Sequence, residues 1–151
     1  MPQIHLQIDA PYQALVNGEQ LKAAVEATLR HQHAPQDAAL SLRITSDEPV
    51  RALNARYRGV DKTTDVLSFP DGSLDPESGV PYLGDIVIAY PRAAAQAQQG
   101  GHPVAWELCL LTVHGVLHLL GHDHATAEEK ALMWAAQREI LQRLGCPLDP
   151  P

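Results

Sequence analysis

The segment from Leu110 to His124 constrains the fold most, because it is strongly apolar and yet carries histidines at positions 114, 118 and 124. A helix advances about 100° and about 1.5 Å per residue, so His114 and His118 lie about 40° apart around its axis and project from one face. Gly121 can adopt a left-handed conformation that ends the helix and brings His124 back toward the other two. The sequence therefore predicts a central helix with a three-nitrogen chelate at its end.

This combination of spacings favours a shared metal ion over three unrelated histidines, although a single histidine on a helix is usually satisfied by a carbonyl group. Three nitrogen ligands with an open fourth position are typical of catalytic zinc. Cys109 lies about 140° around the helix from His114, and His122 and Asp123 fit a supporting role better than a ligand role. We expect one zinc ion per chain, held by His114, His118 and His124.

Length and composition indicate a single domain that spans residues 1–151. The two cysteines do not make a disulfide framework, which favours a reducing compartment. The first residues have neither the basic nor the apolar region of a secretion signal. The apolar run at 108–120 is too short to span a bilayer. We therefore expect a cytoplasmic protein with no membrane partner.

The order of hydrophobic patterns predicts an α+β fold with an α/β-like beginning. Strands are expected at 4–8, 40–44, 65–69 and 82–90, and helices at 18–29, 47–58, 91–99, 103–120 and 127–144. These elements form a four-stranded mixed sheet packed with about five helices, with the metal-bearing helix at the centre. Asn17, Ser46 and Thr126 are the predicted N-caps. The packing faces are predicted to be Val50, Leu53 and Tyr57 in the second helix, and Leu132, Ala136, Ile140 and Leu144 in the last.

A basic patch stands out on a chain whose formal net charge is −7. Such a charge argues against extensive phosphate contacts, but Arg51, Arg56, Arg58 and Lys62 lie within twelve positions. Arg51, Asn54 and Arg58 form one stripe of the second helix. Either an RNA-binding surface or an ordinary solvated helix face agrees with this pattern.

The histidine spacing also matches that of metzincin metalloproteases, and this alternative has to be weighed. Those enzymes need a glutamate immediately after the first histidine to act as general base. Gly115 occupies that position here, and no separate Met-turn is evident. A metzincin-like protease would therefore lack its base.

The motif HGVLHLLGHDH at residues 114–124 resembles the signature of the YbeY family of bacterial endoribonucleases. Two further segments agree with that family, namely DKTTDVLSFP at 61–70, preceded by Asn54 and Arg58, and LGDIVI at 83–88. The resemblance implies a single-strand-directed, metal-dependent endoribonuclease that acts in ribosomal RNA maturation, including the 3′ end of the small-subunit RNA, and in ribosome quality control. It also implies that His114, His118 and His124 bind the metal and that Arg58 is catalytic.

The same resemblance implies partners on the ribosome, including a small-subunit protein and an assembly GTPase. Because the residues reveal no general base, a second class of function stays open. In that alternative, zinc stabilises a ribosome-assembly or RNA-binding factor that has no catalytic activity. A fourth protein ligand to the metal would favour this second class, whereas an open position would favour the enzyme.

Overall fold

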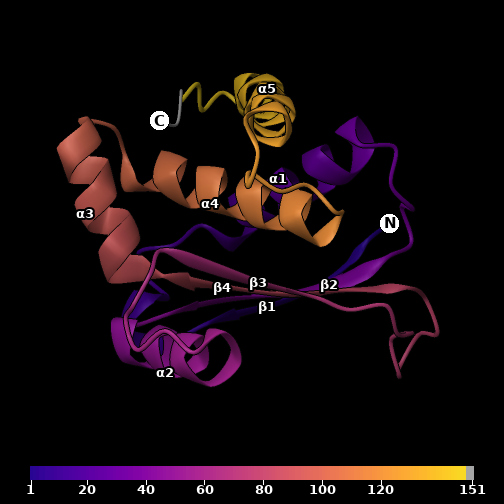
Figure 1. Cartoon of the computed structure of the whole chain (residues 1–151), viewed down its shortest axis with the longest axis horizontal. Helices are drawn as coiled ribbons and strands as arrows, with labels where there is room; N and C mark the ends of the chain where they lie inside the picture. The colour runs from indigo at the N-terminus through magenta and orange to yellow at the C-terminus, as the bar shows by residue number, and fades with distance from the viewer. Residues whose placement is uncertain (149–151) are drawn as a thin grey trace.

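The computed structural model describes residues 1–148, which form one mixed sheet with helices on both of its faces (Figure 1). The strands are β1 (Gln3–Ile8), β2 (Ala39–Thr45), β3 (Val66–Pro70) and β4 (Tyr82–Ala89). The helices are α1 (Gly18–His31), α2 (Asp47–Arg58), α3 (Tyr90–Gly100), α4 (Val104–Leu119) and α5 (Ala127–Arg143), with a short 3-10 helix at Ala10–Tyr12. The predicted α+β fold class is confirmed.

The sheet has the strand order β1-β2-β4-β3. Strands β1, β2 and β4 are parallel, whereas the edge strand β3 runs antiparallel to β4. The predicted mixed sheet is therefore correct. Ile86 and Ile88 of β4 are almost completely buried, as expected for a continuous apolar run in a central strand.

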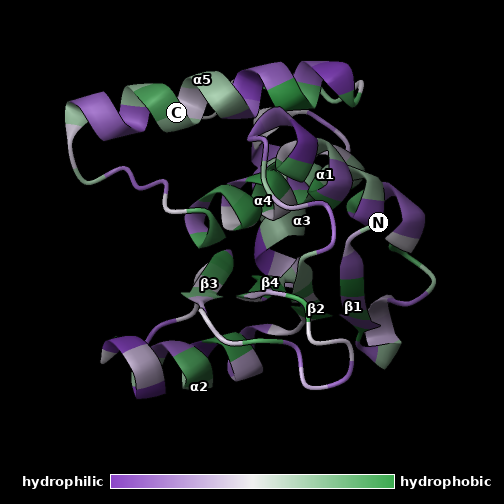
Figure 2. Ribbon diagram, turned by 90° about the vertical axis from the view of Figure 1, so that its right-hand side faces the viewer, coloured by the Kyte–Doolittle hydropathy of each residue, from purple (hydrophilic) through white to green (hydrophobic). Residues whose placement is uncertain are grey.

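Helix α4 lies at the centre of the molecule, between the sheet and α5, while α2 covers the opposite face of the sheet (Figures 1 and 2). Helix α4 contacts α1, α3, α5, β3 and β4, so apolar side chains are required around most of its circumference. Gly115 allows its closest approach to the sheet, because a Cβ atom there would lie 2.8 Å from the side chain of Ile86. Among residues 1–148, no helix combines the length and apolar character that a membrane span requires.

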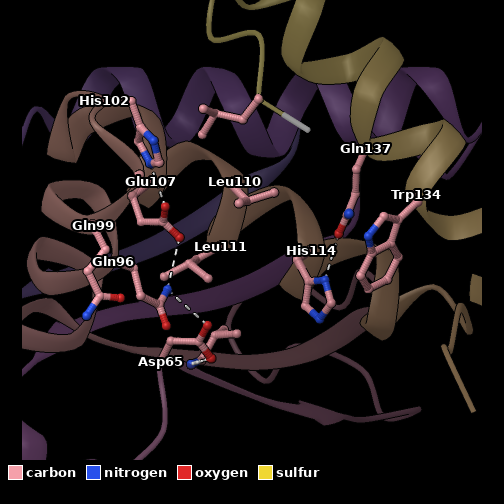
Figure 3. Close-up of a pocket in the computed structure, with 13 residues that line it drawn as sticks. Asp65, Gln96, Gln99, His102, Glu107, Leu110, Leu111, His114, Trp134 and Gln137 are labelled. Atoms are coloured by element: carbon pink, nitrogen blue, oxygen red, sulfur yellow. Dashed lines mark hydrogen bonds and ion pairs between the residues drawn. The ribbon is translucent and has the colours of Figure 1, made fainter. Parts of the chain in front are cut away.

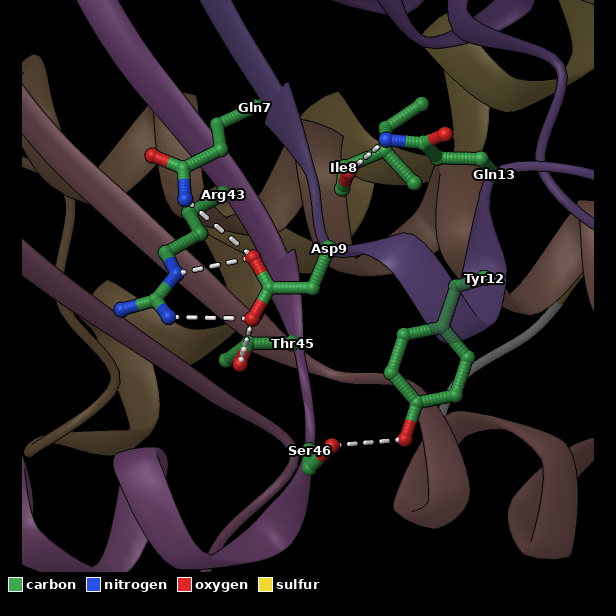
Figure 4. A network of polar contacts seen from close by, with 8 residues as sticks. All are labelled: Gln7, Ile8, Asp9, Tyr12, Gln13, Arg43, Thr45 and Ser46. Atoms are coloured by element: carbon green, nitrogen blue, oxygen red, sulfur yellow. Dashed lines mark hydrogen bonds and ion pairs between the residues drawn. The ribbon is translucent and has the colours of Figure 1, made fainter.

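All three predicted N-cap positions are confirmed, and two of the three side chains form the capping hydrogen bond. Asn17 accepts a hydrogen bond from the Gln20 backbone, and Thr126 accepts one from the Glu129 backbone. Ser46 holds the N-cap position of α2, but its side chain makes no capping bond. Its hydroxyl group instead pairs with the Tyr12 hydroxyl group at 2.8 Å (Figure 4).

The same region contains a polar cluster that ties the end of β1 to β2 (Figure 4). Arg43 donates two hydrogen bonds to the Asp9 carboxylate, at 3.2 and 3.0 Å, and the Thr45 hydroxyl group donates a third at 2.6 Å. The guanidinium group and this hydroxyl group lower the pKa of Asp9 below its ordinary value. The ionised Asp9 carboxylate thus holds the chain after β1 against β2.

The predicted packing faces of α2 and α5 are partly wrong. Tyr57 is 58% exposed, while its neighbour Asn54 is buried and donates a hydrogen bond to the Lys62 carbonyl group. Leu132 is 68% exposed, and Gln137 is completely buried. Asn54 donates to a carbonyl group, and Gln137 accepts a hydrogen bond from His114. These bonds allow an amide to lie on the buried face of each helix, where helical periodicity alone predicts an apolar residue.

Candidate metal centre

The three predicted ligands converge at the C-terminal end of α4. His114 and His118 come from α4, and His124 follows in the loop before α5. One ring nitrogen of each histidine lies within 4.8 Å of those of the other two, and the group could hold a metal ion. Gly121 has a φ of +101°, which glycine tolerates and which allows the chain to turn after the helix. The sequence therefore predicted this juxtaposition correctly.

Gln137 of α5 orients the most buried of the three imidazoles (Figure 3). The Nδ1 atom of His114 lies 2.6 Å from the Gln137 Oε1 atom. An amide oxygen can only accept, so Nδ1 carries the proton and Nε2 keeps the lone pair that a metal requires. Sequence reasoning missed Gln137. The available signal was its place next to Ala136, on the face of α5 that packs against α4.

Burial keeps two of the imidazoles neutral in the metal-free protein. Burial lowers the pKa of His114 below 6.5, and burial together with its two histidine neighbours lowers the pKa of His118 to about 4. A metal binds only the neutral form of histidine, so at neutral pH it displaces no proton from these two rings. The donor set therefore suits a divalent metal of the zinc type.

These pKa shifts predict how the stability of the metal-free protein depends on pH. In the unfolded chain the pKa values of His114 and His118 return to about 6.5, so below that pH the unfolded state binds more protons than the folded state. The free energy of unfolding should consequently fall as the pH decreases from about 6.5 toward about 4. We expect a shallower fall for His118→Ala, measured by urea unfolding at several pH values with a chelator present. Equal slopes for the two proteins would contradict the prediction.

No cysteine or carboxylate joins the three histidines in a metal-binding group within the described chain. Cys109 is buried, and burial together with Cys146 raises its pKa to about 12, so it is not a thiolate ligand. A site with three protein ligands leaves a coordination position for solvent or substrate. This arrangement is the one expected of a reactive metal rather than a structural one.

His122 and Asp123 lie outside the metal-binding group, as expected. The His122 Nε2 atom pairs with the Gln32 Oε1 atom of the segment after α1, at 2.6 Å. Asp123 accepts a hydrogen bond from the His124 backbone at 2.7 Å and shapes the turn. Gln137 is therefore the residue whose side chain forms a hydrogen bond with an imidazole of the metal-binding group, and Asp123 bonds to the backbone instead.

The residues of the predicted basic patch make different contacts. Arg51 pairs with Asp61 and with Glu48, and Asn54, from the same stripe, is buried. Arg58 is the last residue of α2, and its Nη2 atom donates to the Ser68 carbonyl group at 3.3 Å. Because Ser68 belongs to the edge strand β3, the Arg58 side chain is turned toward this edge.

Arg58 approaches the metal-bearing helix through that strand. The Ser68 hydroxyl group donates to the Gly115 carbonyl group at 3.5 Å, and Gly115 directly follows His114. The cavity beside His114 is not lined by Arg58. Arg58 thus lies against β3, and the same strand contacts α4 at Gly115, next to the predicted ligand His114.

Comparison with known proteins shows the family of the chain. The profile of a family described as Endoribonuclease YbeY matches residues 7–145. The chain belongs to the YbeY family. A YbeY endoribonuclease from Chloroflexus aurantiacus is 43% identical over 152 residues, which cover 97% of each chain. Another from Roseiflexus is 41% identical over 148 residues, which cover 94% of this chain and 92% of the relative.

One solved structure also resembles this YbeY chain. It is the solution structure of a Thermotoga maritima protein, which covers 93% of this chain and 91% of its own, with a TM-score of 0.60. Its sequence identity is 24%, so this likeness supports the fold.

The metzincin alternative is not supported for this YbeY member. Gly115 is buried against Ile86 of the sheet, where a Cβ atom would already be too close. A glutamate at this position would not fit, and so it could not serve as the general base of a protease.

Proposed function

We propose that the protein is a metal-dependent endoribonuclease that cleaves single-stranded RNA in ribosomal RNA maturation, including the 3′ end of the small-subunit RNA, and in ribosome quality control. The observation that supports this most directly is a three-histidine group, open to a further ligand, in a chain of the YbeY family. The activity would reside in one domain spanning residues 1–151.

We assign His114, His118 and His124 as ligands of one zinc ion per chain. Their neutral state and the orientation of His114 by Gln137 support this assignment. A zinc ion held there would act as a Lewis acid that withdraws charge from a phosphoryl oxygen and makes water a better nucleophile. The protein's own part is to fix the imidazoles and to bind the phosphate.

Membership of the YbeY family also supports the proposed partners and cellular location. The partners would be ribosomal RNA, a ribosomal small-subunit protein and an assembly GTPase, all in the cytoplasm. No membrane partner is proposed.

The activity can be tested with the metal-loaded protein and a defined RNA that carries one single-stranded and one duplex segment. We expect cuts in the single-stranded segment, and none after His114→Ala substitution, because two remaining nitrogens hold metal poorly. A His114→Ala protein that cuts at the parental rate would overturn the proposal. Tight binding of the RNA by the metal-loaded parent without any cutting would also overturn it, in favour of a zinc-stabilised RNA-binding factor.

Arg58 is the residue proposed to bind the phosphate that is cleaved. Cleavage builds negative charge on the phosphoryl oxygens, and a planar guanidinium group can stabilise that charge with two parallel hydrogen bonds. Arg58 has an exposed position at the end of α2, and its guanidinium group lies one strand away from the metal-bearing helix. Both features are compatible with this role.

We predict that Arg58→Lys lowers the cleavage rate by about tenfold or more, because lysine keeps the charge but loses the planar fork. Metal content and thermal stability should stay nearly unchanged. The matched control is Arg56→Lys, which alters an exposed arginine of the same helix whose guanidinium group lies over the Tyr57 ring at 5.1 Å. If the Arg58→Lys enzyme cut RNA as fast as the Arg56→Lys enzyme, Arg58 would have no phosphate-binding role.

A further inference from the structure

A cavity of about 600 Å³ lies beside the metal centre, among α3, α4, α5 and the beginning of β3 (Figure 3). Its volume is within the range of about 300–1,000 Å³ that is usual for small-molecule pockets. His114 lines one end, and Glu107 lies two turns earlier on the same face of α4. The cavity therefore extends about 10 Å along α4 from the metal centre.

A chain of polar side chains crosses the far end of the cavity (Figure 3). The Gln96 amide nitrogen donates to the Glu107 carboxylate at 3.0 Å and to the Asp65 carboxylate at 3.3 Å. The second oxygen of Glu107 pairs with His102 at 2.7 Å. Since both donated bonds use the nitrogen of Gln96, its oxygen remains an acceptor at the cavity wall. This end of the cavity is therefore rich in hydrogen-bond acceptors.

The charge of the cavity selects which part of a nucleotide can enter. Asp65 and Glu107 contribute carboxylates, and none of the described lining residues is a lysine or an arginine. A phosphate would be repelled by this environment, whereas an uncharged group that donates hydrogen bonds would be attracted. The cavity therefore suits the base of a nucleotide, and the phosphate group would lie outside it, at the metal centre.

Gln137 provides an independent sign that the cavity binds a ligand. Its side chain is completely buried and lines the cavity, and its Oε1 atom is used by His114. Its Nε2 atom is buried without any hydrogen-bond partner. An unpaired buried N–H group costs free energy, so its retention calls for an acceptor that the protein alone does not supply.

We propose that this cavity binds the base of the nucleotide next to the cleaved phosphate, and that it prefers bases with an exocyclic amino group over uracil. This inference rests on the proposed function. Amino groups of adenine, cytosine and guanine can donate to the acceptors at Gln96, Asp65 and Glu107, while a ring nitrogen or carbonyl oxygen accepts from Gln137. Uracil instead presents carbonyl oxygens where the amino group would lie. Bases of single-stranded RNA can be turned out into such a pocket, whereas paired bases cannot.

The preference can be measured without any cleavage, by titrating the metal-loaded protein with AMP, CMP, GMP and UMP and following binding by calorimetry. We expect each amino-bearing nucleotide to bind about tenfold more tightly than UMP, because a good hydrogen-bonded pair discriminates bases to about this extent. Equal affinities for the four nucleotides would overturn the proposal.

A matched pair of substitutions in α3 tests whether this base preference arises in the cavity. Gln99 and Gln98 are adjacent and both exposed, but only Gln99 lines the cavity. Gln99→Leu removes a further amide oxygen from the cavity wall that Gln96 also lines, so we expect it to reduce the preference over UMP to about threefold or less. Gln98→Leu should leave the preference unchanged. Loss of the preference in both variants, or in neither, would contradict the assignment to this cavity. Gln99 is chosen because Gln96→Leu would leave two carboxylates without their shared donor and could prevent folding.

Cleavage assays separate this proposal from the proposed function. Four RNAs that differ only in the nucleotide next to a single cleavage position would be cut with a base preference if both proposals hold. Cutting at equal rates would overturn the base-binding site and leave the endoribonuclease intact. If no RNA were cut but the nucleotides still bound with the expected preference, the activity would be overturned and the binding site supported.

Discussion

Replacement of His118 by alanine is expected to release the metal and to lower the cleavage rate by at least about 100-fold, because a Lewis acid supplies several kcal/mol of transition-state stabilisation. The centroid of the His118 ring lies 4.7 Å from that of His114 and 5.3 Å from that of His124. Its loss leaves two nitrogens that no longer enclose an ion. Elemental analysis would show less than stoichiometric zinc, and added zinc would no longer raise the melting temperature.

The appropriate control for this experiment is His122→Ala, in the same turn of the chain. His122 lies between two proposed ligands in the sequence, yet its side chain contacts Gln32 and is not part of the metal-binding group. The control should therefore keep one metal per chain and a melting temperature that responds to zinc. Full metal occupancy in His118→Ala, or complete loss in His122→Ala, would require a different set of ligands.

The local part of the site could be predicted because it follows from helical periodicity. His114 and His118 are one helical turn apart, so any helix through this segment brings them together. Gly121 then marks the end of the helix, and the chain returns His124 within a short loop. The sheet was predictable for a similar reason, since alternating and continuous apolar runs distinguish its strands. In each case the information lies within a few residues of the sequence.

The rest of the site depends on contacts between distant segments, which periodicity does not contain. Gln137 reaches His114 only because α5 packs across α4. Asp65 and Gln96 meet at the cavity because the beginning of β3 and helix α3 both lie against α4. A buried glutamine in an otherwise amphipathic helix is the one local sign of such a contact. Amphipathicity alone gives the opposite prediction for it, which is why the predicted face of α5 omitted Gln137 and included the exposed Leu132.

Gln137→Leu is expected to weaken metal binding by about 10-fold to 100-fold, although Gln137 is not a ligand. Leucine has a similar size but cannot accept the hydrogen bond that the His114 Nδ1 atom makes at 2.6 Å. The Nδ1–H group of His114 would then lack an acceptor. The imidazole could turn, or its proton could move to Nε2, the atom that the metal needs. Competition with a zinc chelator would measure the affinity, and nitrogen-15 spectra of the imidazoles would report the tautomer of His114.

Two further variants distinguish an orienting role from a loss of packing in the core. Gln137→Glu keeps an acceptor for the His114 N–H group, so it should restore most of the metal affinity, as carboxylates commonly support zinc-bound histidines. Gln142→Leu makes the same change as Gln137→Leu at an exposed position of α5 and should leave metal affinity unaltered. If Gln137→Leu and Gln137→Glu weakened binding equally while His114 kept its Nδ1 proton in both, then Gln137 would serve only to fill space between α4 and α5. If only the leucine variant lost affinity and changed the tautomer, the hydrogen bond itself would be what prepares His114 for the metal.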